Sequence, residues 1–154
     1  MKFPYFVKQP PPDLVRQIPT LRPILKPLIR VALRYKGKKH TLLALIDSGA
    51  DACLFPRDVA DLLGIDVRAG KRQNFTGIGD NNVVPFYFHE VEILIDKYQI
   101  KTEAGFSTKS IGESGNLGQR GFFDQFTIVF DRPNKVIEIK KPGLFQALSA
   151  RLAF

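Results

Sequence analysis

The sequence predicts a mainly β protein, all-β in class apart from one or two short helices. Three observations lead to this prediction: short apolar segments with the period of strands, glycine-rich breaks between them, and few segments with helical start and stop residues. Ten of the twelve glycines lie between Gly49 and Gly121. Short strands joined by tight turns bury their apolar faces by closing into a barrel or stacking as a sandwich. We therefore expect one closed or sandwiched β domain.

The first predicted elements form a hairpin followed by a helix. Residues 29–35 alternate apolar side chains with basic or small ones, which is the period of a half-buried strand. After the turn at 36–38, residues 41–46 form a continuously apolar run, typical of a strand covered on both faces. Pro56–Gly64 has proline at a first helical position and glycine where a helix would end. This pattern predicts a helix of about two turns.

Further elements are expected along the rest of the chain. Strands are predicted at residues 73–78, 83–95, 98–106, 126–131 and 135–139, because turn-forming residues separate these apolar segments. Gly118–Gln125 is a candidate short helical turn. Leucines at 144, 148 and 152 predict an amphipathic helix near the C-terminal end, which could pack on its own body or contribute to a dimer interface.

Charge is distributed unevenly along the 154 residues, whose formal net charge is +8. The first 41 residues contain ten basic side chains and one acidic side chain, whereas the other 113 carry a net charge of −1. Seven of the eleven prolines lie within the first 27 residues. We therefore divide the chain into a basic, proline-rich N-terminal extension (1–27), a main domain (28–141) and a C-terminal amphipathic segment (142–154).

Composition excludes several classes of protein. An apolar content of 44% is too high for disorder throughout the chain, and no apolar stretch approaches the roughly 20 residues of a membrane helix. The N-terminus lacks the apolar core of a secretory signal, so we expect a cytoplasmic protein with no membrane partner. Cys53 is the only cysteine, which excludes an internal disulfide and a multi-cysteine zinc site. His40 and His89 lack metal-ligand spacing, so no metal is expected.

One short segment has the residues of a reactive carboxyl site. Asp47 directly follows the apolar residues 44–46 and is followed by Ser48 and Gly49. A carboxylate at the end of an apolar strand can be oriented by the N–H groups of a tight glycine turn and by a neighbouring hydroxyl. The same three residue types are also the usual residues of turns, so the tripeptide alone favours a plain turn.

The wider context resembles the retroviral-type aspartic proteases, the retropepsins. Residues 44–51 are similar to their active-site signature, in which Asp-Thr/Ser-Gly-Ala follows a short apolar strand. Gly77-Ile78-Gly79, with the strand-like segment after it, resembles their glycine-tipped flap, and Asn116–Phe123 resembles the segment that begins their C-terminal helix. The three segments occur in the family's order and span about residues 28–141. The resemblance, closest to cellular and bacterial retropepsin-like domains, implies a closed acid-protease-type β-barrel with one lobe per chain.

The resemblance also implies a mechanism and a partner. Aspartic proteolysis needs two carboxylates that share one proton, one acting as general base toward a water and the other as general acid. Glu113-Ser114-Gly115 is the nearest second candidate, but it has a glutamate, no apolar strand before it and too little chain after it, so we predict a loop there. The second carboxylate must then be Asp47 of another copy. We therefore expect a homodimeric aspartic endopeptidase acting on a peptide or protein substrate without a cofactor.

Roles for individual residues follow from the same resemblance. Ser48 would hydrogen-bond across the carboxylate pair, and Gly49 would let the substrate backbone approach. Asp51 matches a family acid that pairs with an arginine, but that position is Gln119 here and the arginine follows as Arg120. Either Arg120 takes the role or the pairing is absent. The residues assigned to catalysis are Asp47, Ser48 and Gly49, and those assigned to substrate binding are Ala50, Asp51, Gly77, Ile78, Gly79 and Arg120.

Two other functions stay open. A retropepsin-like fold that no longer cuts would serve as a dimerisation or peptide-binding module, and the intact residues 47–50 argue against it. The basic extension could bind nucleic acid through phosphate contacts. Its charges are scattered among prolines, however, and no RNA-binding or zinc motif accompanies them, so we do not expect a nucleic-acid partner. Cys53 lies among apolar neighbours, which predicts a buried structural thiol rather than a nucleophile.

Overall fold

The computed structural model describes residues 1–76, 83–109, 112 and 114–141 of the chain. Six strands close a mixed β-barrel, in the order β4 (Leu28–Tyr35), β5 (Lys38–Ile46), β10 (Gly115–Leu117), β6 (Leu54–Phe55), β9 (Tyr98–Ser107) and β8 (Val83–Ile95). β8 then pairs with β4, which completes the barrel, and β7 (Lys71–Thr76) extends the sheet outside it by pairing with β8. The predicted class, all-β with a closed barrel, is confirmed.

Strand alternation explains how the barrel closes around its core. Ile29, Val31 and Leu33 of β4 are almost fully buried, and the register Leu33↔Ile93 brings them against β8. Burying one such aliphatic side chain contributes about 1.5–3 kcal/mol. The largest fully buried side chains are Phe55, Phe106, Phe122, Ile29, Leu33, Leu63, Ile93, Ile95, Leu117, Ile137, Ile139 and Val31.

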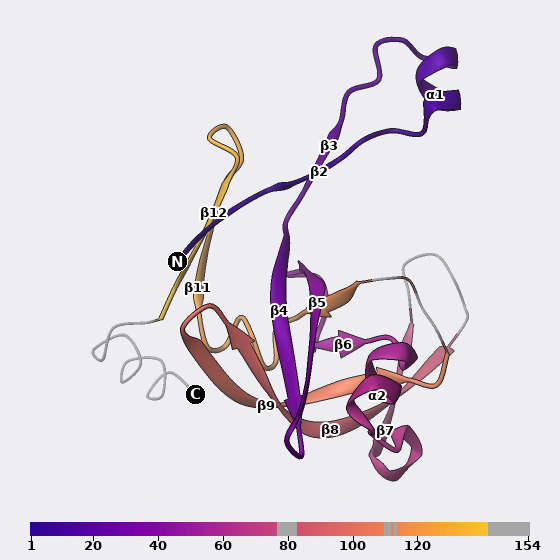
Figure 1. The fold of residues 1–154 in the computed structure, drawn as a ribbon, viewed down its shortest axis with the longest axis vertical. Coiled ribbons are helices and arrows are strands. Elements are labelled where there is room, and N and C mark those ends of the chain that lie inside the picture. Colours follow the sequence, from indigo (N-terminus) through magenta and orange to yellow (C-terminus); the bar gives the residue numbers. More distant parts are fainter. Residues whose placement is uncertain (77–82, 110–111, 113, 142–154) are drawn as a thin grey trace.

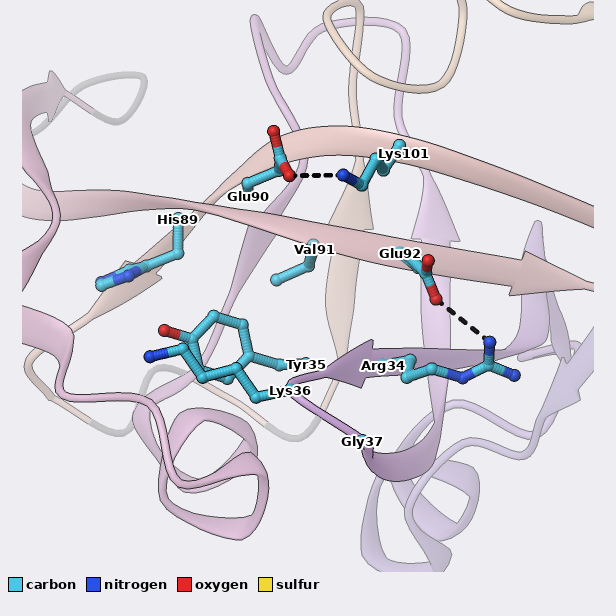
Figure 2. Close-up of a pocket in the computed structure, with 9 residues that line it drawn as sticks. All are labelled: Arg34, Tyr35, Lys36, Gly37, His89, Glu90, Val91, Glu92 and Lys101. Atoms are coloured by element: carbon cyan, nitrogen blue, oxygen red, sulfur yellow. Dashed lines mark hydrogen bonds and ion pairs between the residues drawn. The ribbon is translucent and has the colours of Figure 1, made fainter.

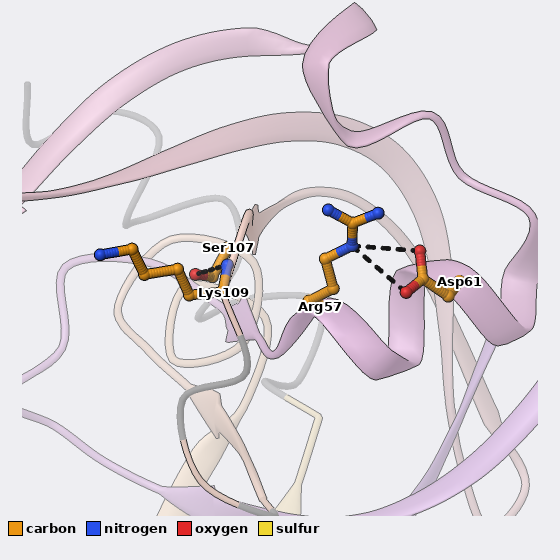
Figure 3. Close-up of polar contacts among 4 residues, drawn as sticks. All are labelled: Arg57, Asp61, Ser107 and Lys109. Carbon is orange, nitrogen blue, oxygen red and sulfur yellow. Dashed lines mark hydrogen bonds and ion pairs between the residues drawn. The ribbon is translucent and has the colours of Figure 1, made fainter.

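Helix α2 (Arg57–Leu63) lies against β5 and β9 and confirms the predicted helix. Pro56 precedes its first turn, and Gly64 ends it in the left-handed region at φ 69°. Its inward side chains are buried, while on its exposed face Arg57 Nε donates to both carboxylate oxygens of Asp61, at 3.2 and 3.3 Å (Figure 3). A 3₁₀ turn, η1 (Val67–Ala69), follows this helix.

A second, three-stranded sheet joins the two ends of the described chain. β1 (Lys2–Pro4) pairs with β12 (Val136–Lys140), which pairs with β11 (Thr127–Asp131). The N-terminal ammonium group donates to the carbonyl of Ile139 at 2.8 Å. Residues 1–5, which lie within the predicted N-terminal extension, therefore pack on the body of the protein.

The rest of the predicted extension forms an arm, residues 6–26. It consists of β2 (Phe6–Lys8), helix α1 (Pro12–Gln17) and β3 (Ile24–Lys26), and β2 pairs only with β3. Figure 1 shows the arm in indigo and purple, projecting away from the barrel with α1 at its tip. None of these elements was expected from the sequence, because two three-residue strands and a six-residue helix are too short to show a period.

Most of the longer predicted elements are confirmed. β4 and β5 form the predicted hairpin, β8 has the predicted bounds, and β9, β11 and β12 each lie within one residue of theirs. β7 ends at Thr76, and the last two residues of the strand predicted at 73–78 lie outside the described residues. The C-terminal helix predicted at 144–152 also lies outside them. No helix in the described part of the chain is long and apolar enough to cross a membrane.

The helical turn expected at Gly118–Gln125 is wrong. This segment forms successive turns instead, with the N–H groups of Phe123 and Asp124 donating to the carbonyls of Gly118 and Gln119. Two features prevent a helix: Arg120 is bridged to Ala52, and Gly121 has a φ of +94°, outside the helical region.

Candidate active site

Asp47 lies directly after β5, at one end of the barrel wall. β10 runs parallel to β5 with Leu117 opposite Ile46, and the N–H of Asp47 donates to the carbonyl of Leu117 at 3.0 Å. Asp47 is half-buried, whereas Ser48 and Gly49 after it are exposed. The backbone of the predicted catalytic residue is thus fixed by the sheet, while the turn after it faces solvent.

Both carboxylate oxygens of Asp47 accept a hydrogen bond. The N–H of Gly49 donates to Oδ1 at 3.0 Å, and Asn116 Nδ2 donates to Oδ2 at 3.2 Å. Donors aimed at both oxygens hold the orientation of the carboxylate. Among the described residues, no ion pair involves Asp47.

Asn116 is the site residue that the sequence analysis did not assign. It begins the segment Asn116–Phe123, which resembles the start of the family's C-terminal helix, but that resemblance gave Asn116 no role. Its approach to Asp47 depends on β10 pairing in parallel with β5, which places Asn116 opposite Leu45. A three-residue strand paired with a segment about 70 positions away leaves no sequence pattern.

A second loop is tied to the Asp47 loop by its backbone and one side chain. The N–H of Gln119 donates to the carbonyl of Ala50 at 2.8 Å, and the N–H of Arg120 donates to the carbonyl of Asp51 at 3.0 Å. Gln119 Nε2 also donates to the carbonyl of Ser48 at 2.7 Å. These three bonds place the segment after β10 beside the turn that follows Asp47.

Close packing leaves room only for glycine at two positions near the site. Where the two loops meet, a Cβ on Gly118 would lie 2.3 Å from the carbonyl oxygen of Ala52. In β10, a Cβ on Gly115 would lie 2.3 Å from the ring of Phe55 of β6. Gly115 begins β10 and is buried, which corrects the loop predicted at 113–115 for this residue. Glu113 lies outside the described residues.

Comparisons with known proteins agree with this geometry at the level of the fold. No protein-family model matches the chain, and no curated protein matches it. Among solved structures, it is similar to a retropepsin-like aspartic protease from Rickettsia conorii, with a TM-score of 0.53 and 15% identity over 73% of this chain and 89% of that one. The chain has a retropepsin-like fold. It is also similar to the EIAV protease complexed with the inhibitor HBY-793, with a TM-score of 0.44 and 24% identity over 60% of this chain and 81% of that one.

Asp51 and Arg120 form no ion pair in the described structure. Arg120 donates from its guanidinium to Gln73 Oε1 of β7 at 3.0 Å and lies over the ring of Phe88, 5.6 Å from its centroid. Asp51 is exposed, and no ion pair among the described residues includes it. Of the two readings left open by the sequence, the structure therefore favours an absent pairing.

The β7–β8 hairpin is joined to the Asp47 region at its base. Ala52 packs in a small buried cluster with Phe86 and Phe88 of β8, and Phe75 of β7 packs against the same cluster. Arg120 reaches this hairpin from the loop after β10. The predicted flap tip, Gly77-Ile78-Gly79, lies outside the described residues, so only the two stems of the hairpin are observed.

Cys53 is buried beneath the two loops, as its apolar neighbours predict. Burial raises the pKa of its thiol to about 12, and the nearby carboxylate of Asp124 adds to the effect of burial. A thiol that stays protonated at neutral pH is a poor nucleophile. No group of His, Cys, Asp and Glu side chains that could hold a metal occurs in the part of the chain that the structure describes.

A separate pocket of about 580 Å³ lies between the β4–β5 turn and the β8–β9 strands (Figure 2). Four of its charged side chains form two ion pairs, Arg34 with Glu92 at 3.1 Å and Lys101 with Glu90 at 2.8 Å, and Lys36 lies over the ring of Tyr35. Asp47 and the loops beside it do not line this pocket. We therefore do not assign it to the candidate active site.

Proposed function

We propose that the protein is a homodimeric aspartic endopeptidase in which Asp47 of each copy supplies one carboxylate. The observation that carries the proposal is the Asp47 carboxylate, which is half-buried at a strand end with a donor on each oxygen. The retropepsin-like fold supports the same reading. One chain provides half of the required pair, so the proposal includes a twofold dimer.

In the proposed reaction, the ionised Asp47 takes a proton from a water whose oxygen attacks the scissile carbonyl carbon. The protonated Asp47 of the other copy gives its proton to the carbonyl oxygen, which yields a neutral tetrahedral diol. The diol collapses when a hydroxyl proton returns to one carboxylate, the amide nitrogen takes a proton from the other, and the C–N bond breaks. After each turnover, the two Asp47 carboxylates again share one proton.

The residues around Asp47 take supporting roles in this proposal. The segment Ser48–Asp51, which is mostly exposed, would line the path of the substrate backbone, and the predicted flap residues Gly77, Ile78 and Gly79 would cover it. Arg120 would act on substrate through its contacts with Gln73 and Phe88, which connect the loop after β10 to the hairpin. The location proposed for the enzyme is the cytoplasm.

A non-catalytic peptide-binding or dimerisation module is the second candidate. Gln119, which occupies the position of the expected arginine, and the absence of an Asp51–Arg120 ion pair in the described structure favour it. The intact donors to Asp47 favour catalysis instead. Measuring cleavage separates the two candidates directly.

The decisive test is cleavage of a peptide library by the wild type, by Asp47→Asn and by the control Asp61→Asn. Asp47→Asn should lower kcat/KM by about 10²–10⁴-fold or more, because the amide cannot serve as general base. Asp61→Asn makes the same chemical change on the exposed face of α2 and should cleave like the wild type. A statine-type inhibitor should block the wild-type reaction. Equal cleavage by Asp47→Asn would contradict the proposed function.

A further inference from the structure

The arm, residues 6–26, exposes apolar side chains that the rest of the described chain leaves uncovered. Leu14 and Val15 of α1 are 43% and 37% exposed, and Ile18, the residue directly after α1, is 47% exposed. No residue of α1 is buried. Among the described residues, six of the ten large exposed apolar side chains belong to the arm, which makes it the main apolar surface. These six are Phe6, Val7, Leu14, Val15, Ile18 and Ile24.

The arm is too small to hold its shape by itself in water. α1 has six residues, whereas isolated helices shorter than about 12–15 residues are marginal in water. β2 and β3 have three residues each and pair only with each other, and an isolated two-stranded hairpin is also marginal. An ordered arm with this composition therefore needs a surface on which its apolar side chains are buried.

The arm leaves the body of the protein beside the candidate active site. Pro27, the residue between β3 and β4, accepts a hydrogen bond from the N–H of Ile46 at 2.9 Å, and Asp47 is the next residue after Ile46. From this point the arm projects away from its own barrel (Figure 1). In a dimer that brings two Asp47 side chains together, the second copy lies at this same end of the barrel.

An apolar hollow continues from the arm onto the body. It has a volume of about 250 Å³ and is lined by Phe3–Phe6 and Leu28–Arg30. Phe6 belongs both to this hollow and to the exposed apolar residues of the arm, so the two features form one continuous apolar surface.

Charge density indicates which part of a second copy the arm contacts. The arm carries four basic side chains and one acidic side chain over 21 residues, a net charge of +3, whereas residues 28–141 carry seventeen basic and fourteen acidic ones, also a net charge of +3 but spread over 114 residues. Two arms laid against each other would bring two concentrated positive charges together, which is unfavourable. The body of the other copy offers fourteen acidic side chains and a lower charge density, so it is the better match.

We propose that the arm of each copy clasps the body of the second copy in the homodimer, burying Leu14, Val15 and Ile18 there. The proposal rests on the dimer included in the proposed function, but it concerns assembly and does not depend on catalysis. The clasp would hold the two barrels with their Asp47 ends facing each other. It would also give the projecting arm an apolar surface that the described part of its own chain does not provide.

The first test compares Leu14→Asn with Leu62→Asn by sedimentation equilibrium. Leu62 is a matched control, because it is also an exposed helical leucine but lies on α2 of the barrel. Leu14→Asn should weaken the dimer at least about tenfold, since a polar amide would replace a buried side chain, whereas Leu62→Asn should leave the dissociation constant unchanged. Circular dichroism should be the same for the wild type and both variants, because Leu14 belongs to neither of the two buried hydrophobic clusters of the described chain.

The second test identifies what the arm touches. A photoactivatable residue at position 15 is introduced into isotopically light chains, which are mixed with heavy chains and cross-linked. Cross-linked peptide pairs that join the arm of a light chain to residues 28–141 of a heavy chain support the proposal. Cross-links only within one chain, for example to residues 142–154, would overturn it, as would a monomeric wild type or a dimer unaffected by Leu14→Asn. Leu14-dependent binding of a monomer to phosphatidylserine vesicles would assign the arm to a membrane surface and also overturn it.

Failure of this proposal is distinguishable from failure of the proposed function. A wild type that cleaves peptides through Asp47 and dimerises independently of Leu14 would keep the enzyme and reject the clasp. A dimer that weakens with Leu14→Asn but shows no Asp47-dependent cleavage would keep the clasp and reject the enzyme.

Discussion

At the scale of the residue, Asn116 helps to hold the carboxylate of Asp47 in position. Asn116 Nδ2 donates to Asp47 Oδ2, and this hydrogen bond fixes the orientation of the carboxylate. In Asn116→Leu, we expect kcat for peptide cleavage to fall by about tenfold with KM little changed, because the carboxylate loses one of the two donors that orient it. Steady-state kinetics measure both constants.

Rescue by another donor separates this positioning role from a purely structural one. Asn116→Ser, which keeps a hydroxyl donor on β10, should recover part of the lost kcat with KM unchanged. A lower melting temperature with an unchanged kcat in Asn116→Leu would show that Asn116 only supports the packing of β10.

The thiol of Cys53 gives a second prediction for a single residue. Its pKa is raised to about 12 by burial, so the folded protein holds it as a neutral thiol at pH 8. We expect a thiol-reactive dye to label Cys53 very slowly in the native protein and completely in denaturant. The reaction is followed by absorbance over time. Rapid labelling of the native protein would contradict the buried environment described for this residue.

β10 is the element on which the geometry of the site depends most. It lies between β5 and β6, and the turn after it passes so close to Ala52 that a Cβ on Gly118 would meet the Ala52 carbonyl oxygen at 2.3 Å. We expect Gly118→Ala to lower the free energy of unfolding by about 1–3 kcal/mol or more, because backbone must move to admit the methyl group.

Gly37→Ala is the control for backbone strain in this experiment. Gly37 has a left-handed φ of 83°, but open space surrounds its added Cβ, so alanine there should cost only about 1 kcal/mol. Both variants are measured by urea unfolding. Equal costs would mean that the close approach at Gly118 is readily relieved.

The elements that the sequence predicts well are those with enough residues to show a period. β8 has thirteen residues, β5 has nine, and α2 has a proline and a glycine at its two ends. β6 and β10 have two and three residues, and their partners lie far away in the chain. Short strands of this kind are fixed by pairing, so local sequence carries no signal for them.

At the scale of the whole molecule, the proposed dimer makes activity depend on both copies. When wild type and Asp47→Asn are mixed in equal amounts and allowed to exchange, activity should fall to about half of that of the wild type alone, because mixed dimers hold one competent carboxylate. The measurement is peptide cleavage before and after exchange. Activity that stays at the wild-type level would show that one chain is sufficient. Dilution below the dissociation constant should also lower the specific activity.

The sequence by itself determined the fold class, the hairpin that leads to Asp47 and the identity of the candidate catalytic aspartate. It did so because strand periods, helix ends and the Asp47-Ser48-Gly49 turn are local features. Only the tertiary structure decided three other features. They are the hydrogen bond from Asn116 to Asp47, the hydrogen bond from Arg120 to Gln73, and the projecting arm. The first two depend on segments far apart in the chain meeting in space, whereas the arm depends on apolar side chains that stay exposed in the described part of the chain.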